Sequence, residues 1–371
     1  MKYKFKGLLS LVSLLLLPAS FISMPKRCEY VYTGADVEYE ETAFIPVGDT
    51  DGVKISTRIS ELFSKDKQGE EKRVIVGGTI FGAQVKTSCV TVMECRNQKH
   101  LKEGDVIVRL EGNDIRSVGD VERVMKESDG QPISAIIRRN GSIMNTTLLP
   151  HESAGEYKLG IRLKDTAAGI GTVTYIDPET GEFGGLGHGI CDPETGEVIP
   201  IRSGEVCGVM LEGVKKGESG KPGELSGILT DRDIGDVWSN TECGIFGKLE
   251  TLPDSSEYCL MEIGKRSEVK VGKAYIYSTV KNGKKTKFDI EITEVDTSSH
   301  GTKSFKIKVT DPTLKAITGG IVRGMSGSPI IQDGKLVGAV THVMVADPTE
   351  GYGIFIENML AAAQMPMAKA S

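Results

Sequence analysis

The sequence predicts a mainly β protein, and three observations support that prediction. Of 371 residues, 45 are glycine, about 12% against a usual level of about 7%. Proline is ordinary at 14 residues and no Gly-X-Y period occurs, so the excess indicates turns and close backbone approaches. Apolar and polar residues alternate between hairpin turns, and no long helical pattern occurs between residues 165 and 350. The length predicts two domains, or three small ones.

The charge of the chain argues against a nucleic-acid partner. The formal net charge is −6, from 45 basic and 51 acidic residues. Residues 1–27 hold five of the basic residues and none of the acidic ones, which leaves −11 on the remainder. Because an acidic body repels polyphosphate, we expect no binding to nucleic acid.

Residues 1–27 indicate a membrane anchor or a signal segment. Gly7 to Met24 is an uncharged stretch of 18 residues, nearly long enough as a helix to cross a hydrocarbon core of about 30 Å. Lysines precede it, so the positive-inside rule predicts export of the chain that follows. A cleaved signal peptide would have the same effect, and the sequence leaves retention or cleavage open. Residues 28–73 are then an exported lead-in.

The cysteines are compatible with export but indicate no metal site. Seven are present, so at least one lies outside any intramolecular disulfide. The sequence contains no Cys-x-x-Cys pair and no Cys/His cluster with zinc spacing. We therefore expect neither a metal nor another cofactor.

Residues 74–163 have the order of elements of a PDZ domain. A glycine-bearing segment precedes an expected strand at 83–93, and the run GDVIVRLEGNDI follows from Gly104. Next come an expected helix capped by Ser117, a strand at 133–138 and an Asn-Gly hairpin. The segment resembles PDZ domains, which bind an extended peptide beside a strand and hold its end on loop N–H groups. An ordinary small β/α domain is the alternative. The resemblance implies a peptide-binding loop that includes Ile80, Phe81 and Gly82.

Residues 164–360 indicate an all-β domain, a barrel or a sandwich. The hexamer Asp-Pro-Glu-Thr-Gly-Glu begins at Asp177 and again at Asp192, and both copies have strong turn chemistry. Strands are expected at 274–279, 286–293 and 303–310, the first two joined by an Asn-Gly hairpin. Residues 361–371 are expected to form a tail.

The run GMSGSP at residues 324–329 indicates nucleophilic chemistry. A serine between glycines on a tight turn exposes its hydroxyl and directs backbone N–H groups at one point, and acyl transfer needs both. A strand, an Asp-Gly turn and a strand at 335–343 follow, as in the nucleophile region that this run resembles, that of chymotrypsin-like serine proteases. The resemblance implies that Ser326 is the nucleophile and that the N–H groups of Gly324 and Ser326 form the oxyanion hole. It also implies that Gly319 and Gly320 lie at the S1 pocket and that Thr341 and His342 form a wall of the cleft. Because those glycines carry no charge, no strict preference for a basic or acidic P1 residue is expected.

His188 is the predicted general base. The other histidines are expected on solvated loops, at the domain junction or in the cleft wall: His100, His151, His300 and His342. His188 lies between the two hexamer turns, where a period of two places it on one strand face with Leu186 and Ile190. A histidine on an apolar face is usually a satisfied core residue, but a serine nucleophile needs a base.

Asp311 is the predicted third member of the site. The residues Phe305, Ile307 and Val309 alternate on one strand face, and Asp311 continues it. A carboxylate at the end of a buried stripe is costly unless it is paired, which favours a role beside the histidine. Asp192 competes for that role, although its turn already explains it.

The order His188, Asp311, Ser326, with the runs GLGHGI, VTDPT and GMSGSP, resembles the stage IV sporulation protein B family of serine peptidases over nearly the whole chain. The resemblance implies a chymotrypsin-like double β-barrel protease domain, a small α+β PDZ domain before it and an N-terminal membrane segment. It also implies the triad at these three positions. Asp311 departs from the broader chymotrypsin pattern, in which the aspartate belongs to the same half as the histidine.

The same resemblance implies an exported serine endopeptidase that acts in sporulation signalling. Such peptidases work in the space between forespore and mother cell, where they cleave a membrane-anchored regulator of an intramembrane metalloprotease, and they cleave their own N-terminal region. The PDZ domain would hold a peptide tail of the substrate or of the chain itself. Two alternatives stay open: a non-catalytic, membrane-tethered PDZ adaptor, and a serine esterase or amidase with the same triad.

Overall fold

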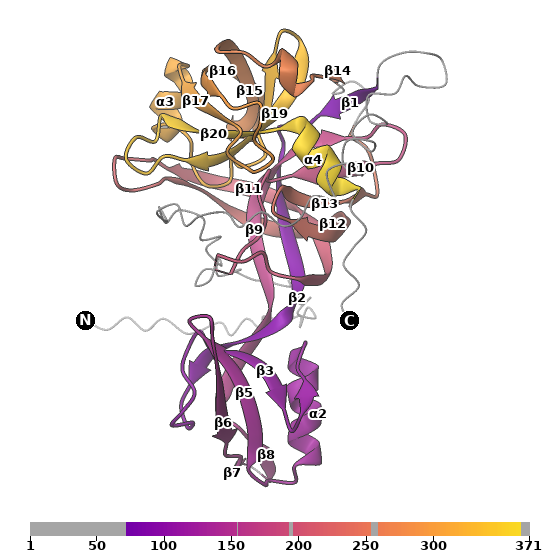
Figure 1. The fold of residues 1–371 in the computed structure, drawn as a ribbon, viewed down its shortest axis with the longest axis vertical. Helices are drawn as coiled ribbons and strands as arrows, with labels where there is room; N and C mark the ends of the chain where they lie inside the picture. The colour runs from indigo at the N-terminus through magenta and orange to yellow at the C-terminus, as the bar shows by residue number, and fades with distance from the viewer. Residues whose placement is uncertain (1–71, 154, 193–195, 254–258, 365–371) are drawn as a thin grey trace, which may run out of the picture.

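The computed structural model describes residues 72–153, 155–192, 196–253 and 259–364 (Figure 1). The predicted anchor at residues 7–24 and nearly all of the lead-in lie outside these residues, as does the tail from residue 365. Among the helices that are described, none is long and apolar enough to cross a membrane. The described chain is mainly β, as predicted.

A first barrel is closed by strands from both sides of the PDZ-like segment. Each strand pairs antiparallel with the next, and the last pairs with the first. Around the barrel these strands are β2 (Ile80–Cys95), β9 (Ile161–Ile176), β10 (Glu182–Gly185), β13 (Gly244–Leu249), β12 (Glu224–Thr241) and β11 (Ile201–Lys215). Its core includes Phe81 and Phe183, whose ring centroids lie 5.7 Å apart at 75°, an edge-to-face contact.

A second barrel is closed by strands from the C-terminal part of the chain. Around it lie β15 (Gly272–Lys281), β16 (Lys284–Val295), β17 (Phe305–Val309), β20 (Glu350–Phe355), β19 (Lys335–Val343) and β18 (Pro329–Gln332). Alternation of apolar and polar residues explains the strands: Phe288, Ile290 and Ile292 of β16 are buried, while the residues between them are exposed. The three strands expected from the sequence in this region are all present.

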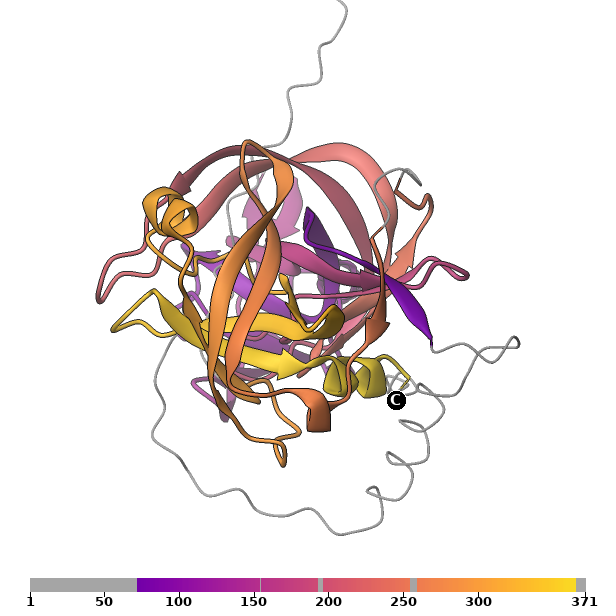
Figure 2. The ribbon, with the colours of Figure 1, turned by 90° about the horizontal axis from the view of Figure 1, so that it is seen from above.

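A short pair of strands and a helix lie between the barrels, as Figure 2 shows from above. Strand β14 (Leu260–Ile263) pairs antiparallel with β1 (Arg73–Val76) and parallel with β19, so it joins the first barrel to the second. Helix α4 (Ile356–Ala363) contacts β10 and β13 of the first barrel and β19 and β20 of the second. A buried cluster that includes Tyr175, Leu336 and Met359 spans this junction.

Buried polar contacts also hold this end of the second barrel. A 3-10 turn, η2 (Arg266–Glu268), places the guanidinium of Arg266 on Glu357 of α4, whose side chain is only 8% exposed. The same guanidinium donates to Asn358 at 2.7 Å. Because a buried ion pair is tolerated only when its hydrogen bonds are complete, these contacts fix α4 in place.

The PDZ-like unit is inserted into the first barrel rather than placed before it (Figure 1). It contains β3 (Val106–Leu110), β4 (Asn113–Asp114), α2 (Val118–Glu127), β5 (Ile133–Arg139), β6 (Ser142–Leu148), β7 (His151–Ser153) and β8 (Glu156–Lys158). Strands β2 and β9 run from the barrel into this unit, with a register shift between Lys86 and Thr91. The predicted boundary at residue 74 is therefore revised, because β1 and the first half of β2 pair within the barrels.

The local predictions inside the PDZ-like unit are confirmed. The Ser117 side chain accepts from the Asp120 amide at the start of α2, and β5 pairs with β6 through the Asn140-Gly141 turn. The unit has a core of its own, which includes Ile107, Val121 and Ile137. It therefore folds around its own apolar residues while two long strands connect it to the barrel.

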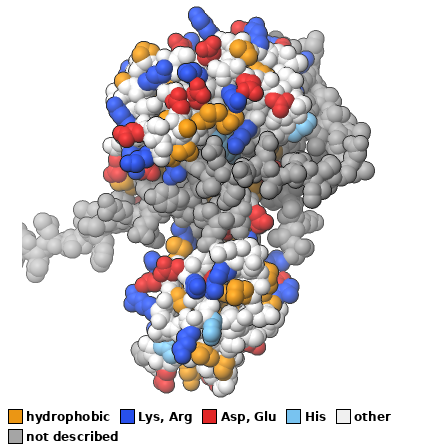
Figure 3. All heavy atoms as spheres, turned by 60° about the vertical axis from the view of Figure 1, so that its left-hand side comes forward, with side chains coloured by type: hydrophobic (Ala, Val, Ile, Leu, Met, Phe, Trp, Pro, Cys, Tyr) orange, Lys and Arg blue, Asp and Glu red, His pale blue; other side chains and the backbone are white. Residues whose placement is uncertain are grey.

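The surface of the molecule carries charges of both signs. On the face drawn in Figure 3, basic and acidic side chains are interspersed over the barrels and over the PDZ-like unit. Neighbouring opposite charges form exposed ion pairs, such as Lys306–Glu294 at 2.6 Å and Lys308–Glu350 at 2.9 Å. Such pairs contribute little to stability individually.

Candidate active site

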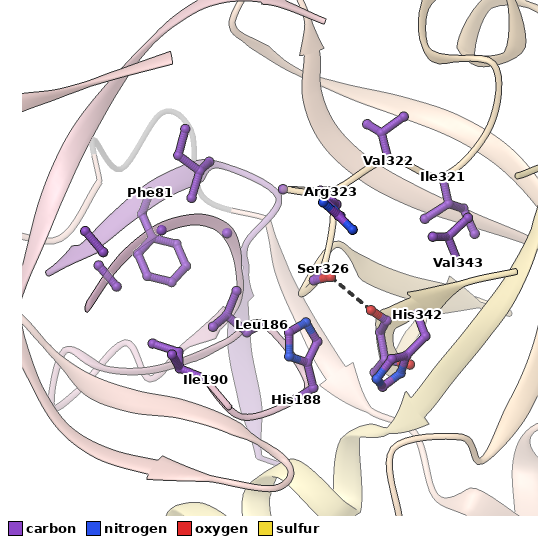
Figure 4. A pocket seen from close by; sticks show the side chains of 17 residues that line it. Phe81, Leu186, His188, Ile190, Ile321, Val322, Arg323, Ser326, His342 and Val343 are labelled. Carbon is purple, nitrogen blue, oxygen red and sulfur yellow. Dashed lines mark hydrogen bonds between the residues drawn. The ribbon is translucent and has the colours of Figure 1, made fainter. Parts of the chain in front are cut away.

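A pocket between the two barrels holds the predicted serine and the predicted histidine (Figure 4). The first barrel contributes residues of β2, β9 and the segment after β10, and the second contributes residues 321–326 and 341–343. Ser326 and His188 line facing parts of this pocket. The structure thus brings together two residues that are 138 positions apart in the sequence.

The turn that carries Ser326 is built from glycines with positive φ. Gly324 has φ of 96° and Gly327 has φ of 93°, values that other residues rarely adopt. Gly327 also has no room for a side chain, because an added Cβ would lie 2.0 Å from the Thr172 carbonyl oxygen. These two glycines turn the chain sharply on either side of Ser326.

Strand β9 fixes the turn from the first barrel. The Thr172 hydroxyl donates to the Gly324 carbonyl and the Thr174 hydroxyl donates to the Gly327 carbonyl, both at 2.8 Å. The Thr172 amide donates to the Ser326 carbonyl at 2.9 Å. With three carbonyls turned toward β9, the amides of Gly324 and Ser326 donate to no protein acceptor within the described residues. This leaves them for the oxyanion-binding role that the sequence assigns to them, which stays a prediction.

His188 lies in a turn after β10, and not on a strand as its period of two suggests. Leu186 and Gly187, with φ of 66° and 71°, end the strand and lead into the histidine. The ring is buried, and its Nδ1 lies 2.9 Å from the Gly189 carbonyl oxygen. A carbonyl can only accept, so Nδ1 carries the proton and Nε2 is left as the basic nitrogen.

Asn240 of β12 holds the segment that follows His188. Its Oδ1 accepts from the Ile190 amide at 2.8 Å, and its Nδ2 donates to the carbonyls of Ile190 and Ile199 at 2.8 and 2.9 Å. No sequence motif marks this residue. The amide satisfies three backbone groups of a turn that would otherwise depend on water.

The Ser326 hydroxyl is hydrogen-bonded to a residue of the predicted cleft wall. Its Oγ donates to the Thr341 carbonyl at 2.9 Å, the hydrogen bond drawn in Figure 4. Thr341 and His342, predicted in the cleft wall, both line the pocket at the end of β19. The nucleophile must leave this carbonyl before a base can take its proton.

Asp311 is not at this site, which corrects the prediction. Strand β17 ends at Val309, and Asp311 is instead the N-cap of α3 (Pro312–Thr318). Its Oδ1 accepts from the amides of Thr313 and Leu314 at 2.7 and 3.0 Å, and it is not among the residues that line the pocket. An aspartate before a proline is a common helix start, which explains the placement.

We expect Asp311→Ala and Asp311→Ser to leave hydrolysis within a few-fold of the wild type. Alanine removes the cap and should cost about 1 kcal/mol of unfolding free energy, whereas serine keeps an acceptor and should cost less. Thermal unfolding and the rate of labelling by a fluorophosphonate measure the two effects. A loss of about 10⁴-fold in both variants, without unfolding, would restore Asp311 to the catalytic site.

The glycines predicted at the S1 pocket also lie elsewhere. Gly319 ends α3 in the left-handed conformation, and added Cβ atoms would meet Gly217 at Gly319 and Pro348 at Gly320. The pocket is lined instead by the next residues along the chain, Ile321, Val322 and Arg323. The expectation of an uncharged wall is therefore wrong, because Arg323 brings a guanidinium to it (Figure 4).

The predicted peptide-binding loop of the PDZ-like unit is also corrected. Ile80, Phe81 and Gly82 begin β2 in the first barrel, and Phe81 lines the pocket that contains Ser326. Within the PDZ-like unit, a groove runs between α2 and residues 155–163. Gly160, with φ of 67°, lies in the segment 155–163 that lines this groove. The error arose because the long strand β2 belongs to both units.

The other candidate groups contribute less to this site. His100 and His151 line other cavities, in the PDZ-like unit, and His300 is exposed. Asp192 forms the second hexamer turn, its carbonyl accepting from the Gly196 amide at 2.9 Å. None of the six cysteines in the described ranges forms a disulfide, and no group of three or more metal-binding side chains occurs there.

Two barrels with a serine turn and a histidine at their junction define a chymotrypsin-like serine peptidase. Residues 155–360 match the SpoIVB peptidase S55 family. This match covers more than half of the 371 residues, and the protein belongs to that family of serine peptidases.

Solved structures similar to this chain include PDZ domains and proteases. The PDZ domain of the SdrC-like protein from Listeria monocytogenes is 19% identical, covering 22% of this chain and 93% of that one, with a TM-score of 0.20. An inactive serine-to-alanine mutant of Rv3671c from M. tuberculosis H37Rv is 14% identical, covering 53% of this chain and 84% of that one, with a TM-score of 0.32. The HtrA-type protease AlgW with a tripeptide is 13% identical, covering 52% of this chain and 54% of that one, with a TM-score of 0.31. A search of curated proteins found no match.

Proposed function

We propose that this peptidase is an exported endopeptidase that cleaves a membrane-anchored regulatory protein, and its own N-terminal region, during sporulation. The observation that carries the proposed chemistry is the pocket in which Ser326 and His188 meet. Membership of the SpoIVB family supports the sporulation role. The expected anchor or signal segment supports export, and the same family membership supports action in the space between forespore and mother cell.

The reaction begins with release of the Ser326 hydroxyl from the Thr341 carbonyl. Nε2 of His188 takes the hydroxyl proton, because Nδ1 is already held by the Gly189 carbonyl. The serine oxygen attacks the scissile carbonyl, and the amides of Gly324 and Ser326 stabilise the oxyanion. His188 then passes its proton to the leaving amine, which departs. In the second half of the reaction, His188 takes a proton from water, the water oxygen attacks the acyl-enzyme, and the proton returns to the Ser326 oxygen.

The PDZ-like unit supports binding of a peptide tail from the substrate or from the chain itself. Its groove lies between a helix and a strand end, the arrangement in which an extended peptide adds to a sheet. The ribbon of β2 and β9 joins that groove to the barrel that carries His188. A tail held there would be tethered beside the cleft, which raises its effective concentration.

We expect a fluorophosphonate to label the purified protein at Ser326, and the same preparation to cleave casein. The serine turn is preformed, so labelling needs no substrate-induced folding of that turn. Mass spectrometry of the labelled peptide and gel analysis of casein measure both outcomes. A folded protein that is not labelled would favour the PDZ adaptor. Labelling with casein left intact would favour an esterase or amidase.

A further inference from the structure

A second histidine lies against the proposed base. His342 follows Thr341 on β19, and its ring centroid is 5.3 Å from that of His188, with the planes inclined by 38° (Figure 4). Both rings also line a second cavity. The sequence indicates only a cleft wall at this position.

His342 is held in its neutral form. Burial, the adjacent His188 and then Lys303 lower the pKa of His342 to about 3. At neutral pH the ring therefore carries no charge, and His188 can accept a proton without facing a second cation. A neutral imidazole has one nitrogen that donates and one that accepts.

One nitrogen of this ring is buried without a hydrogen-bond partner. Nδ1 of His342 has no partner among the described residues. A buried polar atom of this kind costs stability, and a phenylalanine of similar shape would remove the cost. The unsatisfied atom lies in the ring that contacts the base.

Among the described residues, the carboxylates near His188 are less well suited to accept its proton. Asp311 is bound to the start of α3. Glu197 and Glu242 line the second cavity with both histidines, but both are exposed, and Glu197 pairs with Arg138 at 3.2 Å. An exposed carboxylate is screened by water, whereas His342 contacts the base directly.

We propose that His342 is a positioning residue for His188, in the place that a carboxylate holds in most serine-histidine-acid sites. This inference rests on the proposed function. When His188 has taken the Ser326 proton on Nε2, both of its nitrogens are donors, and the unpartnered nitrogen of His342 accepts from Nδ1–H in place of, or together with, the Gly189 carbonyl. The contact orients the ring and favours the imidazolium, and no bond is made or broken beyond those of peptide hydrolysis.

The test compares His342→Phe, which keeps the ring and removes the nitrogens, with His342→Gln, which keeps an acceptor. We expect the phenylalanine variant to lose about 10- to 100-fold in kcat and in the rate of fluorophosphonate labelling, with KM within about twofold. Its melting temperature should be unchanged or higher, because the unsatisfied nitrogen is gone. Glutamine should restore much of kcat. His300→Phe, at an exposed loop histidine, is the matched control and should change neither quantity.

The pH dependence of kcat/KM gives a readout that a purely structural role would not change. An acceptor that favours the charged form raises the pKa of His188, so its removal should move the acidic limb to lower pH. Within the part of the chain that the structure describes, the charged and titratable groups around His342 are His188, Lys303, and across the second cavity Glu197, Glu242 and Cys191. The carboxylates are kept in the variants, so a shift reports the loss of His342 itself.

Three outcomes would overturn the inference. An unchanged kcat in His342→Phe removes the role, and a rise confined to KM makes His342 a substrate-binding wall only. A large loss of kcat in Glu242→Gln together with an active His342→Phe transfers the role to that carboxylate. If the wild type is not labelled at Ser326, the proposed function itself fails. Normal wild-type labelling with an active phenylalanine variant refutes only the role of His342.

Discussion

Replacing Ser326 by alanine will lower peptide hydrolysis by about 10⁴- to 10⁶-fold and abolish fluorophosphonate labelling. Ser326 supplies a hydroxyl on the part of this turn that lines the pocket between the barrels, and alanine leaves the turn and its hydrogen bonds to β9 in place. Kinetic assay on a peptide substrate and intact-mass analysis after labelling measure the loss. If the peptidase processes itself, the full-length variant will also keep its N-terminal segment.

Ser328 provides a matched control on the same turn. Its hydroxyl is buried and has no hydrogen-bond partner among the described residues, so Ser328→Ala removes an unsatisfied oxygen. We expect this variant to keep activity within a few-fold and to be as stable as the wild type, or more so. Equal losses in the two variants would mean that the turn is structural and that the nucleophile lies elsewhere.

Local patterns predicted the elements of the fold because their causes are local. Alternation placed the ends of β16 and β17 within two residues, and the cap at Ser117 and the Asn140-Gly141 turn follow from single side chains and backbone conformations. The serine turn was also predictable, since its glycines are adjacent in the sequence. Such features need no knowledge of what the segment packs against.

The position of the PDZ-like unit depends on long-range pairing. Residues 74–82 contain glycines suited to a loop, but Phe81 packs on Phe183, and β2 pairs with β11, whose residues lie 114 to 125 positions after their partners. No local pattern distinguishes a strand of the barrel from the first strand of an inserted unit. The predicted boundary and the predicted peptide loop failed for this one reason.

The prediction for Asp311 failed although the sequence contains the information needed. Alternation from Phe305 to Val309 suggested that the strand continues, but Asp311-Pro312 is an N-cap followed by proline at the first helical position, and Gly319 then ends the helix. A helix start outweighs alternation there because proline cannot donate to a neighbouring strand. For His188 the predicted position in the pocket is right but the predicted local structure is wrong, since the residue reaches the pocket from a turn and not from a strand face.

Gly327→Ala will lower the free energy of unfolding by more than the addition of one methyl group would suggest. An added Cβ would lie 2.0 Å from the Thr172 oxygen and 2.5 Å from the Leu186 nitrogen, both backbone atoms that cannot rotate away. Alanine at a φ of 93° is strained in addition. Together these effects should cost about 3–5 kcal/mol of unfolding free energy. Any protein that stays folded must move Ser326 relative to His188, so kcat should fall by about 100-fold or more.

Gly334→Ala separates strain from clash. Gly334 has a similar φ of 80° in the turn between β18 and β19, but nothing lies within 4 Å of an added Cβ. This variant should cost only about 1–2 kcal/mol and leave kcat unchanged. Denaturant unfolding and peptide hydrolysis are measured for Gly327→Ala and Gly334→Ala. Because both positions have positive φ, the difference in stability between the two variants reports the clash with β9 alone. Equal stabilities would contradict the close approach of the serine turn to Thr172 and, with it, the way in which the first barrel holds the nucleophile of the second.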